Sequence, residues 1–131
     1  MIDVETDVFD YVYPSVAPLV PEGCFSGVYV SHPPAFPFVT LMEMDNYTYT
    51  QFRSSSDEEE YAVITYEANV YAMNKQECRD IMNALDTAMD RLNFTRMNVT
   101  FTPNLEDETI FRMTARFRAA ADKDKRIYRR S

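Results

Sequence analysis

The most constraining feature of this sequence is a two-residue alternation over residues 61–73, which a helical pattern follows at once. The small or apolar members of the alternation are Ala62, Ile64, Tyr66, Ala68, Val70 and Ala72. Thr65, Glu67 and Asn69 occupy intervening positions. Because successive side chains of a strand point to opposite faces of a sheet, the alternation predicts a strand with one apolar and one polar face.

Residues 74–92 carry the second strong pattern, that of an amphipathic helix. Asn74 is a suitable N-cap, and Glu77 three positions later completes a capping-box-like pair. Apolar side chains then recur at helical spacing, at Cys78, Ile81, Met82, Leu85, Met89 and Leu92. Asn93 suits the left-handed residue that closes such a helix.

The rest of the chain predicts one more helix and several strands. Residues 2–13 have a helical pattern, with Asp3 as N-cap and an apolar stripe that includes Val8, Tyr11 and Val12. Pro14 then ends or kinks this helix, with Val16 and Leu19 continuing the stripe for another turn. Strands are predicted at residues 25–30, 36–44, 96–102 and 109–119, and a short strand or docked tail at 126–130. The apolar pattern is lost at about 45–60, where we expect a long mobile loop.

This order of elements predicts the α+β class, with a single domain over residues 1–131. We expect one layer of mostly antiparallel sheet with two main helices packed on one face. No apolar run approaches the roughly 20 residues of a membrane span, and the first residues are acidic where a signal peptide is basic. We therefore expect a protein that is made in the cytoplasm and soluble there.

Charge is distributed unevenly along the chain, whose net charge is −8. Residues 1–67 hold 12 acids and one base, a net of −11, whereas residues 68–131 hold nine acids and 12 bases, a net of +3. Such asymmetry suits a head-to-tail contact between copies, acidic side against basic side. The alternative is that both sides are simply solvated. The negative total argues against nonspecific binding of nucleic acid.

No group of residues in the sequence suggests catalysis. The only histidine, His32, lies in a Ser-His-Pro-Pro stretch, and two glycines are too few for a phosphate-binding loop. Cys24 and Cys78 lie far apart and form no CxxC motif. Glu43 and Glu67 fall on predicted strands, where a catalytic pair is conceivable, but cross-strand pairing with arginine explains them more simply. We expect no enzymatic activity, no cofactor and no metal site.

The sharpest remaining feature is the polar side of the strand at 109–119, which carries Arg112, Arg116 and Arg118. Like charges at a spacing of two repel one another unless an acid lies opposite. Glu67 can supply that acid within the subunit if the two strands are neighbours. An acidic patch on an adjacent copy is the second possibility, and nucleic-acid phosphate is a distant third.

Seven stretches of the sequence, in order, carry a resemblance to a known family. They are residues 33–39 (PPAFPFV), 42–46 (MEMDN), 66–71 (YEANVY), 92–96 (LNFTR), 103–105 (PNL), 109–116 (TIFRMTAR) and 127–130 (IYRR). Together they resemble tail-terminator, or tail-completion, proteins of siphophages and prophages over residues 2–130. Each stretch alone is unspecific, and their order and spacing make the resemblance.

The resemblance implies a structural virion protein that forms a ring, a hexamer, at the head-proximal end of the phage tail. Such rings end polymerisation of the tail tube and present a surface to the head connector, while DNA passes through without base-specific reading. The implied partners are further copies of the chain, the tail-tube protein and the connector or stopper protein, with no membrane. The alternatives are a head–tail connector or stopper subunit and, in a different class, an acidic module that binds a basic protein.

Two sets of residues are candidates for these contacts. The candidates for the interface between subunits are Glu67, Arg112, Arg116, Arg118, Arg129 and Arg130. The candidates for a loop that contacts the tube or the connector are Arg53, Asp57, Glu58, Glu59 and Glu60.

Overall fold

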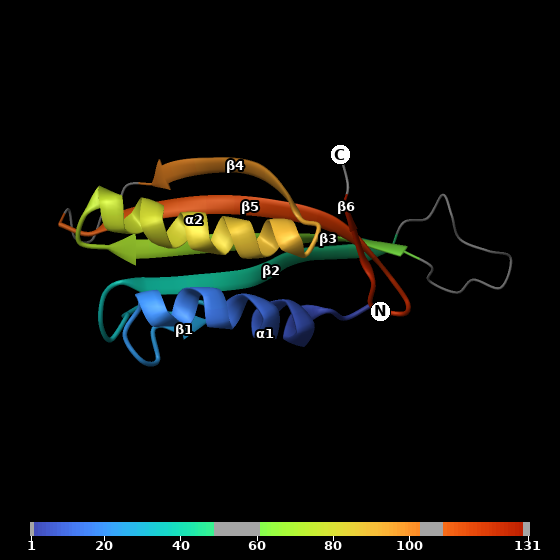
Figure 1. Cartoon of the computed structure of the whole chain (residues 1–131), viewed down its shortest axis with the longest axis horizontal. Helices are drawn as coiled ribbons and strands as arrows, with labels where there is room; N and C mark the ends of the chain where they lie inside the picture. The colour runs from blue at the N-terminus through green and yellow to red at the C-terminus, as the bar shows by residue number, and fades with distance from the viewer. Residues whose placement is uncertain (1, 49–60, 103–108, 130–131) are drawn as a thin grey trace, which may run out of the picture.

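The computed structural model describes residues 2–48, 61–102 and 109–129. Their secondary structure consists of two α-helices, one short 3-10 helix and six strands (Figure 1). The elements are α1 (Glu5–Val16), η1 (Ala17–Leu19), β1 (Phe25–Ser26), β2 (Phe38–Thr48), β3 (Tyr61–Ala72), α2 (Lys75–Arg91), β4 (Thr95–Thr102), β5 (Phe111–Asp122) and β6 (Ile127–Arg129).

The strands form one open sheet in the order β1-β2-β3-β5-β4, and β6 pairs with the end of β5. Only the β1–β2 pair is parallel, and the other four pairs are antiparallel. Both helices lie on the same side of the sheet, as Figure 1 shows. The α+β class predicted from the sequence, a mostly antiparallel sheet with its helices on one face, is therefore confirmed.

The core lies between the helices and the apolar face of the sheet. The alternating residues of β3 from Ala62 to Ala72 are at most 1% exposed, as are Cys78, Leu85 and Met89 on α2. The α2 cap forms as predicted, because the Asn74 carboxamide oxygen accepts the Glu77 N–H at 2.7 Å. Asn93 follows α2 with a φ of 69°, the predicted left-handed closure.

Helix α1 differs from its prediction at its N-terminal end, whereas at Pro14 the structure decides between the two alternatives. Its N-cap is Val4, without a side-chain hydrogen bond, and Asp3 accepts the Glu5 N–H at 3.0 Å from one position earlier. Pro14 does not end the helix, which continues to Val16. Pro14 lies on the exposed side, where water can bind the carbonyl that the missing N–H leaves free. Tyr11 is 46% exposed, since the buried stripe runs at a spacing of four through Val8, Val12 and Val16.

The strands also differ from their predicted bounds. The strand expected at 25–30 is only Phe25–Ser26, and the one expected at 36–44 runs from Phe38 to Thr48. Residues 45–48, predicted as the start of a loop, therefore belong to β2, where a bulge at Glu43/Asp45 lets pairing with β3 continue to Thr48↔Ala62. The rest of that predicted loop lies outside the described residues.

The apolar stripe of α2 gives a direct test of this core. Leu85→Ala removes a fully buried side chain and should lower the free energy of unfolding by about 2–5 kcal/mol in urea denaturation. Thr87→Ala, on the exposed side of the same turn, is the control and should change it by less than about 0.5 kcal/mol. Similar losses for both variants would mean that α2 packs through a different face.

Candidate functional site

The face of the sheet opposite the helices is polar along its two central strands. The antiparallel register of β3 with β5 places Glu67 opposite Arg116, Asn69 opposite Thr114 and Tyr71 opposite Arg112. Glu67 and Asn69 are buried, at 9% and 1% exposure, although no helix covers this face. Side chains of β5 that bind them, from Arg112, Thr114 and Arg116, contribute to this burial.

Asn69 is the centre of a hydrogen-bond network on this polar face. Its Nδ2 donates to Glu67 Oε1 at 3.1 Å. Its Oδ1 accepts from Arg112 Nε at 3.0 Å and from the Thr114 hydroxyl at 2.8 Å. Arg116 completes the network, since its Nε and Nη2 each lie 3.2 Å from Glu67 Oε2. The Asn69 amide thus links Arg112 to the carboxylate of Glu67, which Arg116 binds directly.

The guanidinium of Arg112 also lies over the Tyr71 ring, 5.6 Å from its centroid. Burial raises the pKa of the Tyr71 hydroxyl, and the nearby Arg112 charge partly opposes that rise. Arg112 is therefore held by an amide oxygen and an aromatic ring rather than by a carboxylate.

The three arginines of β5 thus have different environments. Of the two main alternatives that the sequence leaves open, pairing with Glu67 within the subunit is realised for Arg116. Arg118 lies between Thr65 and Thr95 in register. Its Nε is buried, and no acceptor in the described part of the chain hydrogen-bonds to it. Arg118 is therefore the arginine of this strand with hydrogen-bonding capacity to spare.

Arg129 has an internal role. Its guanidinium binds the carbonyl oxygens of Asp90 and Phe94, at 2.9 and 3.2 Å, and the Asp90 carboxylate at 3.0 Å. A cation at this position stabilises the C-terminal end of α2 and fastens β6 to it. The docked tail predicted at 126–130 is confirmed for β6. The other candidates, Arg53, Asp57, Glu58, Glu59, Glu60 and Arg130, lie outside the described residues.

The fold converts the charge asymmetry of the sequence into two edges of the sheet. We call α1, β1 and β2 the acidic edge, because residues 2–48 contain seven acids and no lysine or arginine. We call β4 and β5 the basic edge, which carries four arginines, Arg96, Arg112, Arg116 and Arg118, against the single acid Asp122. Since β3 lies between β2 and β5, the two edges are on opposite sides of the molecule (Figure 1).

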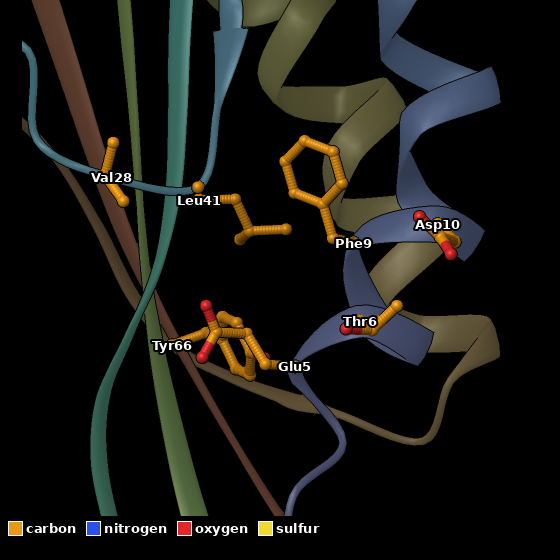
Figure 2. Close-up of a pocket in the computed structure, with 8 residues that line it drawn as sticks. Glu5, Thr6, Phe9, Asp10, Val28, Leu41 and Tyr66 are labelled. Atoms are coloured by element: carbon orange, nitrogen blue, oxygen red, sulfur yellow. The ribbon is translucent and has the colours of Figure 1, made fainter.

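A cavity of about 340 Å³ opens in the acidic edge between α1 and β2 (Figure 2). Glu5, Phe9 and Asp10 of α1 line one side, and Leu41 and Tyr66 of the sheet line the other. The figure shows the Glu5 carboxylate at the end of the cavity where Tyr66 lies.

Carboxyl groups crowd around this end of the cavity. Burial raises the pKa of Glu43, and the nearby carboxylates of Glu5 and Asp3 raise it further. Burial likewise raises the pKa of the Tyr66 hydroxyl, with Glu43, Glu5 and Asp3 adding to the effect. The acidic edge therefore contains closely spaced carboxylates, and their mutual repulsion and partial burial disfavour the charged form of Glu43.

The structure separates the two carboxylates that the sequence suggested as a conceivable catalytic pair. Glu43 pairs with Tyr66 on the helix side of the sheet, whereas Glu67 is on the polar face, so the conceivable carboxylate pair does not form. No group of three or more potential metal ligands occurs among the described residues. Within the same residues, no helix is long and apolar enough to cross a membrane.

The sequence matches no known family model and no curated protein.

Two features of these sites were missed at the sequence level. The central role of Asn69 was not recognised, although its place between Glu67 and Tyr71 on the polar side of the alternation was a usable signal. The juxtaposition of Tyr66 with Glu43 and Glu5 had no local signal, because the three residues come from three different elements.

The Asn69 network predicts a specific stability effect. Asn69→Ala removes the acceptor of two donors and should lower the free energy of unfolding by about 1–3 kcal/mol in urea denaturation. Asn98→Ala, an exposed amide on β4 opposite Arg116, is the matched control and should have little effect. Equal effects would show that the network contributes nothing beyond ordinary sheet pairing.

The raised pKa of Glu43 predicts a pH-dependent effect of Glu43→Gln. Between the unfolded and folded pKa values the native state binds more protons, so the wild type loses stability as pH rises through that window. Glu43→Gln should therefore be more stable than the wild type at pH 7, and the gain should vanish below the ordinary value of 4.5. Urea denaturation at several pH values measures this difference in the free energy of unfolding, and Asp45→Asn, at an exposed position, is the control. A difference that does not vary with pH would contradict this cause.

Proposed function

We propose that this chain is a tail-terminator subunit of a long-tailed bacteriophage. In this role it assembles into a ring at the head-proximal end of the tail, ends polymerisation of the tail tube and joins the tail to the head. The ordered resemblance over residues 2–130 supports the proposal. So does the α+β fold, since a sheet flanked by helices is what the resemblance implies.

The observation that carries the proposal is the placement of opposite charges on opposite edges of the sheet. A contact that joins the basic edge of one copy to the acidic edge of the next is head-to-tail. Such a contact uses two different surfaces of each subunit, so it repeats around a ring and leaves no free edge once the ring closes. Attraction between the edges also favours the correct orientation over like-charge alternatives.

The described strands leave both edges free for this contact. β4 has β5 as its strand neighbour, and β1 pairs with β2 only at Val39 and Thr40. Arg118 on the basic edge retains an unpaired buried Nε–H. An acid from the next copy can satisfy it, as the second alternative for the arginine strand requires.

The negative net charge of −8 fits a ring through which DNA moves. Phosphate contacts with arginine or lysine hold DNA in place, whereas a predominantly negative protein repels the backbone. The proposed partners are the tail-tube protein and the connector or stopper protein of the head.

A second candidate, an acidic module that binds a basic protein, is favoured by one observation, the absence of lysine and arginine from residues 2–48. These candidates and the connector or stopper alternative differ in how they assemble. A terminator forms discrete closed rings, a connector or stopper subunit forms rings without capping the tube, and an acidic module stays monomeric until a basic partner is added.

Native mass spectrometry and negative-stain imaging test the terminator function. They are applied to the purified chain alone and to its mixture with the tail-tube protein of the same phage. We expect discrete rings that cap tube ends and stop their growth. Arg118→Glu should abolish rings while leaving the circular dichroism spectrum unchanged, because it reverses an interface charge. This variant is cleaner than Arg116→Glu, which also breaks the internal pair with Glu67.

Arg91→Glu is the matched control, since Arg91 is exposed on α2 and away from the polar face. It should form rings normally. A wild-type chain that neither self-associates nor binds the tube protein would remove the terminator function from consideration.

A further inference from the structure

We propose that the cavity between α1 and β2 receives the Arg96 side chain of a second copy of this chain. Its aliphatic part would lie against Phe9 and Leu41, and its guanidinium would bind the Glu5 carboxylate and the Tyr66 hydroxyl. This inference rests on the proposed head-to-tail assembly and names the contact that joins its two edges.

The walls of the cavity suit an aliphatic stem. Phe9, Val28 and Leu41 supply apolar surface, and Val28 remains 66% exposed in the isolated subunit. Gly27 also lines the cavity, where an added Cβ would lie 3.6 Å from the Phe9 ring, in ordinary contact. A longer side chain at position 27 would therefore extend into the space that the stem of an arginine would occupy.

The chemistry at the far end of the cavity suits a hydrogen-bond donor with positive charge. Tyr66 is 1% exposed, and its hydroxyl has no hydrogen-bond partner. Glu43, opposite Tyr66 in register, has a buried Oε1 that also lacks one. A buried polar atom without a partner is costly, and so is a group of like charges. A guanidinium, with several N–H donors and a positive charge, can relieve both.

A guanidinium on a stem fits better than a bare metal ion. Calcium and magnesium take about six or more oxygen ligands in a compact shell. No three potential metal ligands cluster among the described residues, and Phe9, Val28 and Leu41 occupy much of the wall. A ligand that is apolar along its length and cationic at its tip matches this surface.

The source of the cation follows from the position of Arg96 on the sheet. It lies on β4, the last strand of the basic edge, and its pairing with Phe117 places it on the helix side. The cavity opens on the same side of the sheet at the acidic edge. When two sheets meet edge to edge in the same orientation, Arg96 of one copy and the cavity of the next are therefore brought together.

Arg96 is available for this exchange. Its partner within the subunit is Asp86, at 3.1 Å, and the two side chains are 50% and 31% exposed. Exposed pairs of this kind contribute at most about 1 kcal/mol. The cavity offers two carboxylates, those of Glu5 and Asp10, and the Tyr66 hydroxyl, which has no partner, so the contact between copies can compete with the internal pair.

The first test uses the Arg118→Glu background, in which rings should not form and the cavity should be empty, and follows the binding of n-butylguanidine by NMR chemical shifts. We expect saturable shifts at Phe9 and Tyr66, with n-butanol of the same stem length much weaker. Glu5→Gln and Tyr66→Phe should each weaken binding at least about tenfold, and Gly27→Leu should abolish it by filling the space. Asp7→Asn, exposed on α1 outside the cavity, is the control and should bind normally.

Tyr66→Phe should unfold at the same or a higher urea concentration than the wild type, because its hydroxyl has no partner to lose. This result separates a binding defect from a folding defect. Absence of saturable n-butylguanidine binding, or binding that Glu5→Gln and Gly27→Leu leave intact, overturns the cavity as a site for a cation.

The second test measures self-association by sedimentation velocity in a double-mutant cycle. Glu5→Gln and Arg96→Gln should each weaken association at least about tenfold, and the double variant should be little worse than either. If the double variant loses affinity by the product of the two single losses, Arg96 is not the occupant of the cavity. The same holds if Arg96→Gln weakens association no more than the Arg91→Gln control does. If the wild type forms rings that Glu5→Gln leaves unchanged, the inference fails while the terminator function stands. If the wild type never associates, the terminator function itself fails.

Discussion

The pairing of β3 with β5 is the constraint on which the rest of the structure depends. It joins the two 12-residue strands along their whole length, from Tyr61↔Asp122 to Ala72↔Phe111. Because side chains alternate between faces, this register places both apolar sets under the helices and both polar sets on the other side. A slip of one residue would expose the apolar face and bury the arginines.

That register also decides which charges remain available to partners. Arg112 donates a hydrogen bond to Asn69, and Arg116 donates one to Glu67, so the polar groups in the middle of this face have partners within the subunit. Buried polar atoms without a hydrogen-bond partner occur on the outer strands, at Thr40 and Glu43 of β2 and Thr95 of β4, and on the inner strands at Tyr66 and Arg118. The opposite charges of the two edges, together with these groups without partners, suit lateral association between copies, and this property underlies the proposed ring.

How much of this could be predicted depends on the range of the interactions involved. Local signals succeeded, as in the Asn74 cap and the docking of β6. They failed where distant contacts dominate, since pairing with β3 extends β2 to Thr48 through residues that resemble a loop. The pairing of Glu67 with Arg116 was one of two alternatives, since the neighbour of a strand is not encoded in its alternation.

The sequence by itself determined the class of fold, the inward face of β3 and α2, and the ends of α2, because two-residue and helical periodicities and caps act within a few residues of chain. Only the tertiary structure decided the strand order, the partners of the arginines and the cavity that Glu5 and Tyr66 share. Those features depend on contacts between elements far apart in the chain. Strand order alone turned an acidic half and a basic half of the sequence into opposite edges of one sheet.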